Sequence, residues 1–103
     1  MTIKDIIAKY NLPKNTVGIQ VSPCLGITSY VRRVVRSYFK DVKVMYVDDN
    51  IELSIPRQED TEDDTVSALT IPKDYWIINV DNKRLIITTE DHLDSAINVT
   101  DPV

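Results

Sequence analysis

The chain has 103 residues, of which 43% are hydrophobic and 27% are charged, and its formal net charge is −4. This length supports a single domain, residues 1–103, with one modest core. The lone cysteine excludes an internal disulfide, and no apolar run approaches the roughly 20 residues that a membrane-spanning helix needs.

Charge is segregated along the sequence. Residues 1–47 carry eight Lys or Arg against two acidic residues, whereas residues 48–103 carry four against fourteen. This separation predicts one electropositive and one electronegative region, a property that steers charged partners but does not define a fold. The N-terminus carries charges through its first apolar stretch, unlike a signal peptide, so we expect a cytoplasmic protein.

The first predicted element is a short helix that ends before Pro13. Thr2 and Asp5 are spaced as in a capping box, in which the two residues exchange side-chain and backbone hydrogen bonds. Apolar residues then recur at helical spacing, at Ile3, Ile6, Ile7 and Tyr10. Residues 17–21 alternate apolar with small or polar side chains, which predicts a half-buried strand.

A loop over residues 22–26 leads into the clearest helical pattern of the chain, a helix over residues 29–40 capped by Thr28 or Ser29. Its apolar face is formed by Val31, Val34, Val35, Tyr38 and Phe39. Its opposite face carries Arg32, Arg33, Arg36 and Lys40. The helix is therefore amphipathic, with a basic side that faces away from the core.

The next part of the chain predicts strands. They are expected over residues 42–47, 51–55, 66–71, 75–80 and 84–89. Asp and Asn residues between the first two and the last two of these strands predict two β-hairpins. A short helix over residues 90–97, capped by Thr88 or Thr89, and a frayed tail at 98–103 complete the chain.

Together these elements predict an α+β fold. We expect a mainly antiparallel sheet of about five to six strands with two to three helices, one of them the amphipathic helix packed on the sheet. Residues 56–65 separate two strands with a low-complexity stretch that predicts a mobile loop. Its acidic residues are Glu59, Asp60, Glu62, Asp63 and Asp64. They lack the ligand spacing of a calcium loop, so we interpret them as a solvated acidic loop.

The basic face is the first candidate site. Arg32, Arg33, Arg36 and Lys40 could contact an acidic protein surface, pair with the acidic loop of the same chain, or remain solvated. Trp76 stands at the start of a strand, where an exposed aromatic ring would anchor an interface and a buried one would fill the core. We take these five residues as the candidate partner-binding set.

A nucleic-acid-binding regulator is one alternative. The basic helix 29–40 could lie along a phosphate backbone. Residues 6–17 also resemble the helix-turn-helix family at its turn, where Asn11 occupies the usual glycine position and Leu12 falls at an expected offset. The resemblance implies DNA binding, but it departs from the family where the strand pattern begins and where Pro23 would interrupt a recognition helix.

A second alternative is a small thiol or anion-binding protein. Cys24 precedes the amphipathic helix, and with Thr28 and Ser29 it could form an anion or redox site at the helix N-terminus. The spacing matches neither the cysteine phosphatases nor the thiol loops of the phosphotransfer system. An ordinary strand-to-helix turn is the competing interpretation.

The residue inventory argues against an enzyme. Two glycines, one cysteine and a single histidine, His92, provide neither a phosphate-binding loop nor a His-based metal site or catalytic triad, and no cofactor is expected. We therefore expect a small non-catalytic protein that acts by protein–protein interaction. Its size and acidity resemble the accessory and inhibitor proteins of phages and mobile elements, and its opposite charges would also permit self-association.

Overall fold

The computed structural model describes residues 1–56 and 66–98 of the chain. It contains three α-helices and six strands in two antiparallel sheets, so the predicted α+β fold is confirmed. The expected acidic loop, with Glu59, Asp60, Glu62, Asp63 and Asp64, and most of the expected frayed tail lie outside the described residues.

The elements follow one another along the chain as α1 (Ile3–Tyr10), β1 (Val17–Gln20), α2 (Ile27–Val35), β2 (Lys43–Val47), β3 (Asn50–Pro56), β4 (Val66–Ile71), β5 (Trp76–Val80), β6 (Arg84–Thr88), the 3-10 turn η1 (Glu90–His92) and α3 (Leu93–Ile97). The strands divide into a sheet of order β1-β5-β6 and a sheet of order β2-β3-β4. Every pair of neighbouring strands is antiparallel.

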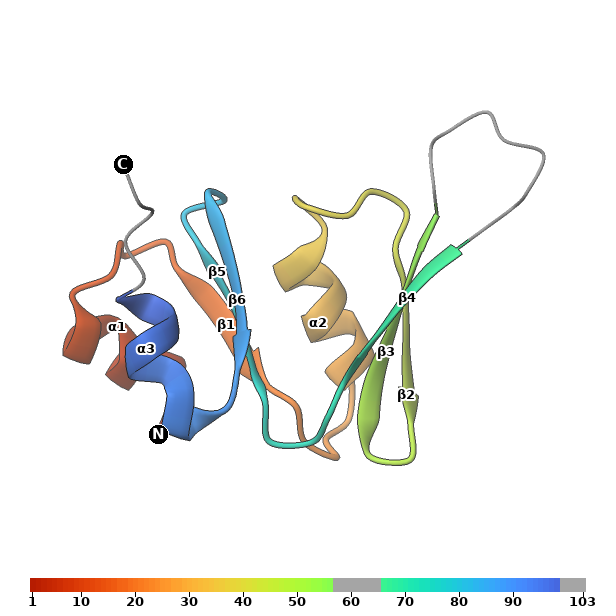
Figure 1. The fold of residues 1–103 in the computed structure, drawn as a ribbon, viewed down its shortest axis with the longest axis horizontal. Helices are drawn as coiled ribbons and strands as arrows, with labels where there is room; N and C mark the ends of the chain where they lie inside the picture. The colour runs from red at the N-terminus through yellow and green to blue at the C-terminus, as the bar shows by residue number, and fades with distance from the viewer. Residues whose placement is uncertain (57–65, 99–103) are drawn as a thin grey trace.

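The elements are stacked in layers (Figure 1). α1 and α3 lie on one face of the first sheet, and α2 lies between its other face and the second sheet. Two apolar clusters result, one around α2 and one beneath α1 and α3. Strand β5 contributes to both, because Ile77 faces the α2 cluster and Ile78 faces the other.

The N-terminal helix begins as the sequence predicts. The hydroxyl of Thr2 accepts a hydrogen bond from the backbone amide of Asp5, and the carboxylate of Asp5 accepts one from the backbone amide of Thr2. These two hydrogen bonds form the predicted capping box. These two hydrogen bonds lower the pKa of the Asp5 carboxyl. After Asn11 the chain turns into β1, so the second helix that the helix-turn-helix resemblance implied is absent from these residues.

Gly18 lets α1 pack tightly against β1. A Cβ atom at this position would lie 2.8 Å from Cδ1 of Ile3 and 3.1 Å from both the Ile77 carbonyl oxygen and Cγ1 of Ile78. We expect Gly18→Ala to lower the free energy of unfolding by about 1–3 kcal/mol, as overpacking does, measured by urea denaturation. Ile3→Val removes Cδ1, the atom nearest to the added Cβ. The double variant Gly18→Ala/Ile3→Val should therefore lose less stability than the sum of the losses in the two single variants. Strictly additive losses would contradict this packing.

Helix α2 is shorter than predicted and starts differently. It begins at Ile27 after Gly26, whose φ of 80° suits glycine, and no side chain caps it. Thr28 and Ser29, the expected caps, lie inside the helix. The helix ends at Val35, so Tyr38, Phe39 and Lys40 lie beyond it rather than on its faces.

Both predicted hairpins are present. β2 and β3 are joined by Asp48 and Asp49, with φ of 50° and 66°, and the β5–β6 turn has positive φ at Asp81 and Asn82. Asp and Asn tolerate this left-handed conformation better than other residues with a side chain, which is why these turns can close. The expected C-terminal helix is divided into η1 and α3. The hydroxyl of Thr89, one of its expected caps, lies 2.8 Å from Nδ1 of His92 and caps no backbone amide.

Candidate functional site

Helix α2 has one fully buried side and one basic side. Its buried side chains, which fill the space between the two sheets, are Ile27, Val31, Val34 and Val35. The opposite side exposes Arg32, Arg33 and Arg36. Because the apolar side is used entirely for packing, the surface that α2 offers to a partner is basic.

The three arginines are free of carboxylate partners within the described part of the chain. There, no carboxylate oxygen lies within 4.0 Å of a charged nitrogen of Arg32, Arg33 or Arg36. Arg33 instead lies over the ring of Tyr30, with 6.0 Å between the guanidinium carbon and the ring centroid. Tyr30 is 48% exposed, so the pair presents a cation on an aromatic ring at the surface.

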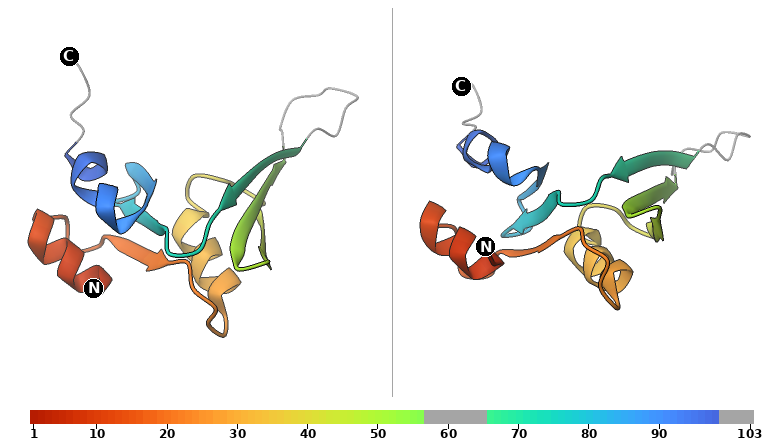
Figure 2. Two further views of the ribbon diagram at one scale, coloured as in Figure 1. Left: turned by 60° about the horizontal axis from the view of Figure 1, so that its bottom comes forward. Right: turned by 90° about the horizontal axis from the view of Figure 1, so that it is seen from below.

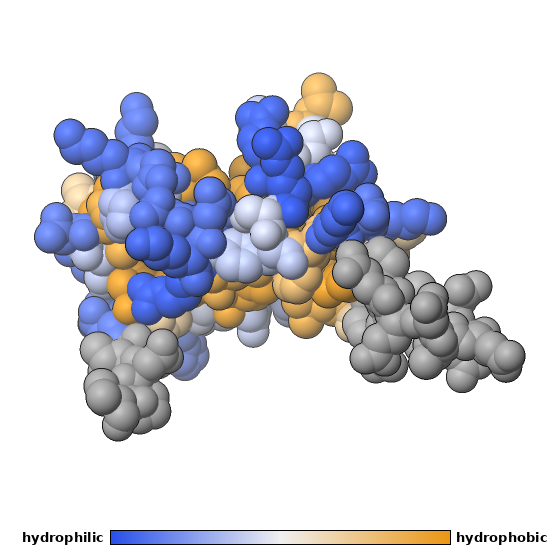
Figure 3. Space-filling model, turned by 90° about the horizontal axis from the view of Figure 1, so that it is seen from above, coloured by the Kyte–Doolittle hydropathy of each residue, from blue (hydrophilic) through white to orange (hydrophobic). Residues whose placement is uncertain are grey.

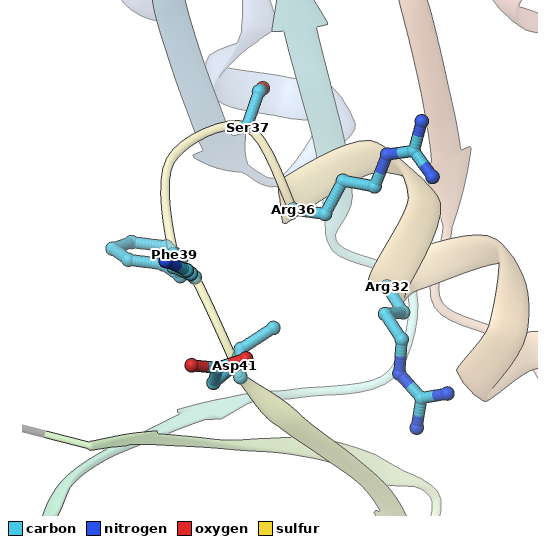
Figure 4. Close-up of a pocket in the computed structure, with 7 residues that line it drawn as sticks. Arg32, Arg36, Ser37, Phe39 and Asp41 are labelled. Atoms are coloured by element: carbon cyan, nitrogen blue, oxygen red, sulfur yellow. The ribbon is translucent and has the colours of Figure 1, made fainter.

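A hollow of about 500 Å³, open to solvent, lies beside the C-terminal half of α2. It is lined by Arg32, Arg36, Ser37, Phe39, Lys40, Asp41 and Val42. In Figure 4, Arg32 and Arg36 extend from α2 on one side while Phe39 and Asp41 lie on the other. Lys40 has left the helix, but the turn after α2 returns it to the same hollow as the two arginines.

The walls of the hollow combine positive charge with apolar surface. Phe39 is half-buried and Val42 is buried in the α2 cluster, whereas the Lys40 side chain is exposed. Figure 3 views the end of the molecule where α2 finishes, and hydrophilic residues cover much of it with apolar residues visible between them. A surface of this kind can bind a negatively charged segment that also carries an apolar side chain.

A buried amide fixes the turn that forms this hollow. Asn79, on β5, is 4% exposed, and its Nδ2 lies 3.1 Å from both the Val34 carbonyl oxygen and Oγ of Ser37 and 2.9 Å from Oδ1 of Asn82. Its Oδ1 accepts one hydrogen bond from the Tyr38 hydroxyl, at 3.1 Å, and one from the backbone amide of Asn82, at 2.9 Å. The end of α2, the following turn and the β5–β6 turn are thus tied to one side chain.

The Tyr38 hydroxyl is held in its protonated form. Partial burial raises its pKa, and the negative charge of Asp81 raises it further. At neutral pH the hydroxyl therefore remains a donor to Asn79. The sequence contains no local signal for this network, because an Asn within a strand pattern is more readily interpreted as an exposed residue.

Trp76 does not belong to the exposed surface. It is 4% exposed and lies in the cluster beneath α1 and α3, with Ile6, Leu93 and Ile97. The interpretation of Trp76 as an interface anchor is therefore wrong, because its ring fills the core. Its Nε1 has no hydrogen-bond partner among the described atoms.

The Cys24 loop is an exposed, closed turn. The amide of Cys24 donates to the Ser22 carbonyl at 2.8 Å, and the amide of Ile27 donates to the Cys24 carbonyl at 3.2 Å. Cys24 and Ser29 are exposed and Thr28 is half-buried. The backbone amide of Ile27, the first residue of α2, therefore donates within the turn. No described feature adds a ligand-binding group to Cys24, Thr28 and Ser29.

The described residues provide neither a metal site nor a membrane-spanning helix. Over residues 1–56 and 66–98 no group of three or more His, Cys, Asp or Glu side chains is placed to hold a metal ion. Within the same residues, none of the helices has the length and apolar content needed to cross a membrane. The chain gave no significant match to protein-family models, to curated proteins or to solved structures.

Proposed function

We propose that this chain is a small non-catalytic binding protein of the cytoplasm that docks onto an acidic protein through the basic surface formed by Arg32, Arg33, Arg36 and Lys40. The observation that carries the proposal is the exposure of three arginines without a carboxylate partner in the described residues. Exposed charges of one sign attract oppositely charged partners and raise the rate of association.

The apolar part of the hollow favours a protein partner over a bare polyanion. Arginine and aromatic side chains are enriched at protein interfaces, and the basic surface includes Phe39, which lines the hollow, and Tyr30, which lies beneath Arg33. A phosphate backbone would use the cations alone. A role as an accessory or inhibitor protein of a phage or mobile element is the finer form of this proposal, and it is supported by size and charge segregation alone.

Nucleic-acid binding is the second candidate, because Arg33 over Tyr30 is also a suitable platform for stacking a base. It predicts retardation of DNA or RNA at low salt, with a steep loss of affinity as salt rises. A gel-shift titration of the purified protein against single- and double-stranded DNA and RNA at about 50 mM salt tests this candidate, and absence of any retardation eliminates it.

The test of the favoured function is charge reversal. The protein is used to capture partners from its native cells, and a retained protein is then purified and titrated against Arg32→Glu/Arg36→Glu. We expect at least a tenfold loss of affinity, about 1.4 kcal/mol, because two guanidinium groups are replaced by carboxylates that repel an acidic surface.

The matched control is Lys4→Glu/Lys14→Glu, which makes the same change in net charge at exposed positions away from α2. It should retain the wild-type affinity within about threefold. Equal losses in the two variants would show that only net charge matters, and the assignment of the site to α2 would be rejected. Failure of the wild type to retain any specific protein would reject the function itself.

A further inference from the structure

Among the described residues, strand β4 has one edge that pairs with no strand. It is the last strand of the sheet of order β2-β3-β4, and the described strand beside it is β3. In Figure 2 this strand, coloured green-blue, forms the rim of the second sheet, and no other described strand runs along its outer side. Ala68, Leu69 and Thr70 are all exposed along it.

This edge lacks the features that normally protect an open strand. Natural edge strands are kept from pairing by lysines, prolines, short length or bulges. β4 is six residues long and carries no charged residue and no proline within its span. The other edges differ, because β2 carries Lys43, β6 carries Arg84, and β1 is only four residues long and packs against two helices.

The hairpin geometry shows which backbone groups point outward. The two-residue turn makes Val47 and Asn50 a hydrogen-bonded pair, and hydrogen-bonded pairs then alternate along the ladder. By this alternation Leu53 directs its backbone amide and carbonyl away from β2 and bonds to Leu69 of β4. The neighbouring residues Ala68 and Thr70 therefore direct their backbone amides and carbonyls away from the sheet. These outward groups form a free pairing template.

Leu69 adds exposed apolar surface to the template. It shares the inner face of the sheet with Val44 and Leu53, both of which are buried, but it is 39% exposed. α2 packs mainly on β2, so this face of β4 is covered at Ile71, which is buried in the α2 cluster, but less at Leu69. A strand added beside β4 would cover Leu69.

We propose that β4 pairs with β4 of a second copy of this chain, antiparallel and about a two-fold axis, so that two three-stranded sheets join into one of six strands. A neutral strand suits self-pairing because no like charges face each other. Ala68, Leu69 and Thr70 also provide no charge by which a different peptide sequence would be selected.

The test is the oligomeric state of the full chain. Sedimentation equilibrium and light scattering over about 10 μM to 1 mM should show the mass rising from 11.8 kDa toward twice that value, since an edge-to-edge joint is a small, reversible interface. Amide hydrogen exchange supplies a local signal. The outward amides of Ala68 and Thr70 should gain protection as concentration rises, while that of Leu69 is protected throughout.

The variant Ala68→Lys/Thr70→Lys places two lysines on this edge and should keep the protein monomeric at 1 mM, with an unchanged circular dichroism spectrum. Met45→Lys is the matched control. Together with Lys43, this substitution gives β2, at the opposite edge of the same sheet, a pair of lysines two residues apart, as in the β4 variant. The Met45→Lys protein should dimerise as the wild type does. A wild type that stays monomeric at 1 mM, or dimers that persist in the β4 variant, would overturn the proposal.

Discussion

Asn79→Leu should lower the free energy of unfolding by about 3 kcal/mol or more. Leucine is similar in size but can neither donate nor accept, so it leaves the Val34 carbonyl, the Tyr38 hydroxyl and the Asn82 amide without their partner. A buried polar group left unsatisfied costs about 1–3 kcal/mol, and several are lost together here. Denaturant unfolding followed by circular dichroism measures the loss.

Tyr38→Phe is the control for this prediction. It removes one hydroxyl and one hydrogen bond at the edge of the network, so the expected loss is about 1 kcal/mol. Asn79→Leu should also lower the affinity for any partner that binds in the hollow, because Asn79 binds Ser37 in the turn that carries Phe39. If Asn79→Leu were as stable as the wild type, the network would not hold this turn.

Ile77→Ala and Ile78→Ala should each lower the free energy of unfolding by about 2–5 kcal/mol. Both side chains are fully buried on β5, but they face opposite sides of the first sheet. Each substitution therefore opens a cavity in a different cluster. Because one strand joins the two clusters, we expect a single cooperative transition at a lower urea midpoint in both variants, with similar slopes.

Val17→Ala is the control for this pair. Val17 is an apolar residue of the same sheet, but it is exposed, so its truncation should cost less than about 1 kcal/mol. A large loss for Ile77→Ala with none for Ile78→Ala would contradict the layered arrangement. It would mean that α1 and α3 do not pack on the first sheet.

Local sequence patterns predicted most of the elements correctly. The alternation at residues 17–21, the hairpin turns at Asp48 and Asp81, and the apolar face of α2 each depend on residues within one turn or one strand of one another. The position of Arg32, Arg33 and Arg36 opposite the buried side of α2 followed in the same way, from helical spacing alone. Those predictions succeeded because periodicity determines which side of an element is apolar.

Predictions that required knowledge of neighbours were less successful. The predicted helix ran to Lys40, but it ends at Val35, where Asn79 binds the Val34 carbonyl and Ser37 from 42 or more residues away. Trp76 was included among the candidate partner-binding residues while a core position was left open, because alternation cannot show that both faces of β5 are covered. The expected caps at Thr28 and Ser29 failed because the helix begins at Ile27, two residues earlier than predicted, with Gly26 as its N-cap.

The sequence by itself determined the fold class, the identity of the strands and the separation of charge, because these follow from composition and short-range periodicity. Only the tertiary structure decided that the strands form two sheets with α2 between them, that Lys40 rejoins the arginines around a hollow, and that β4 is an open edge. Each of these depends on which distant segments meet, and long-range pairing is set by the packing of the whole chain rather than by any one segment.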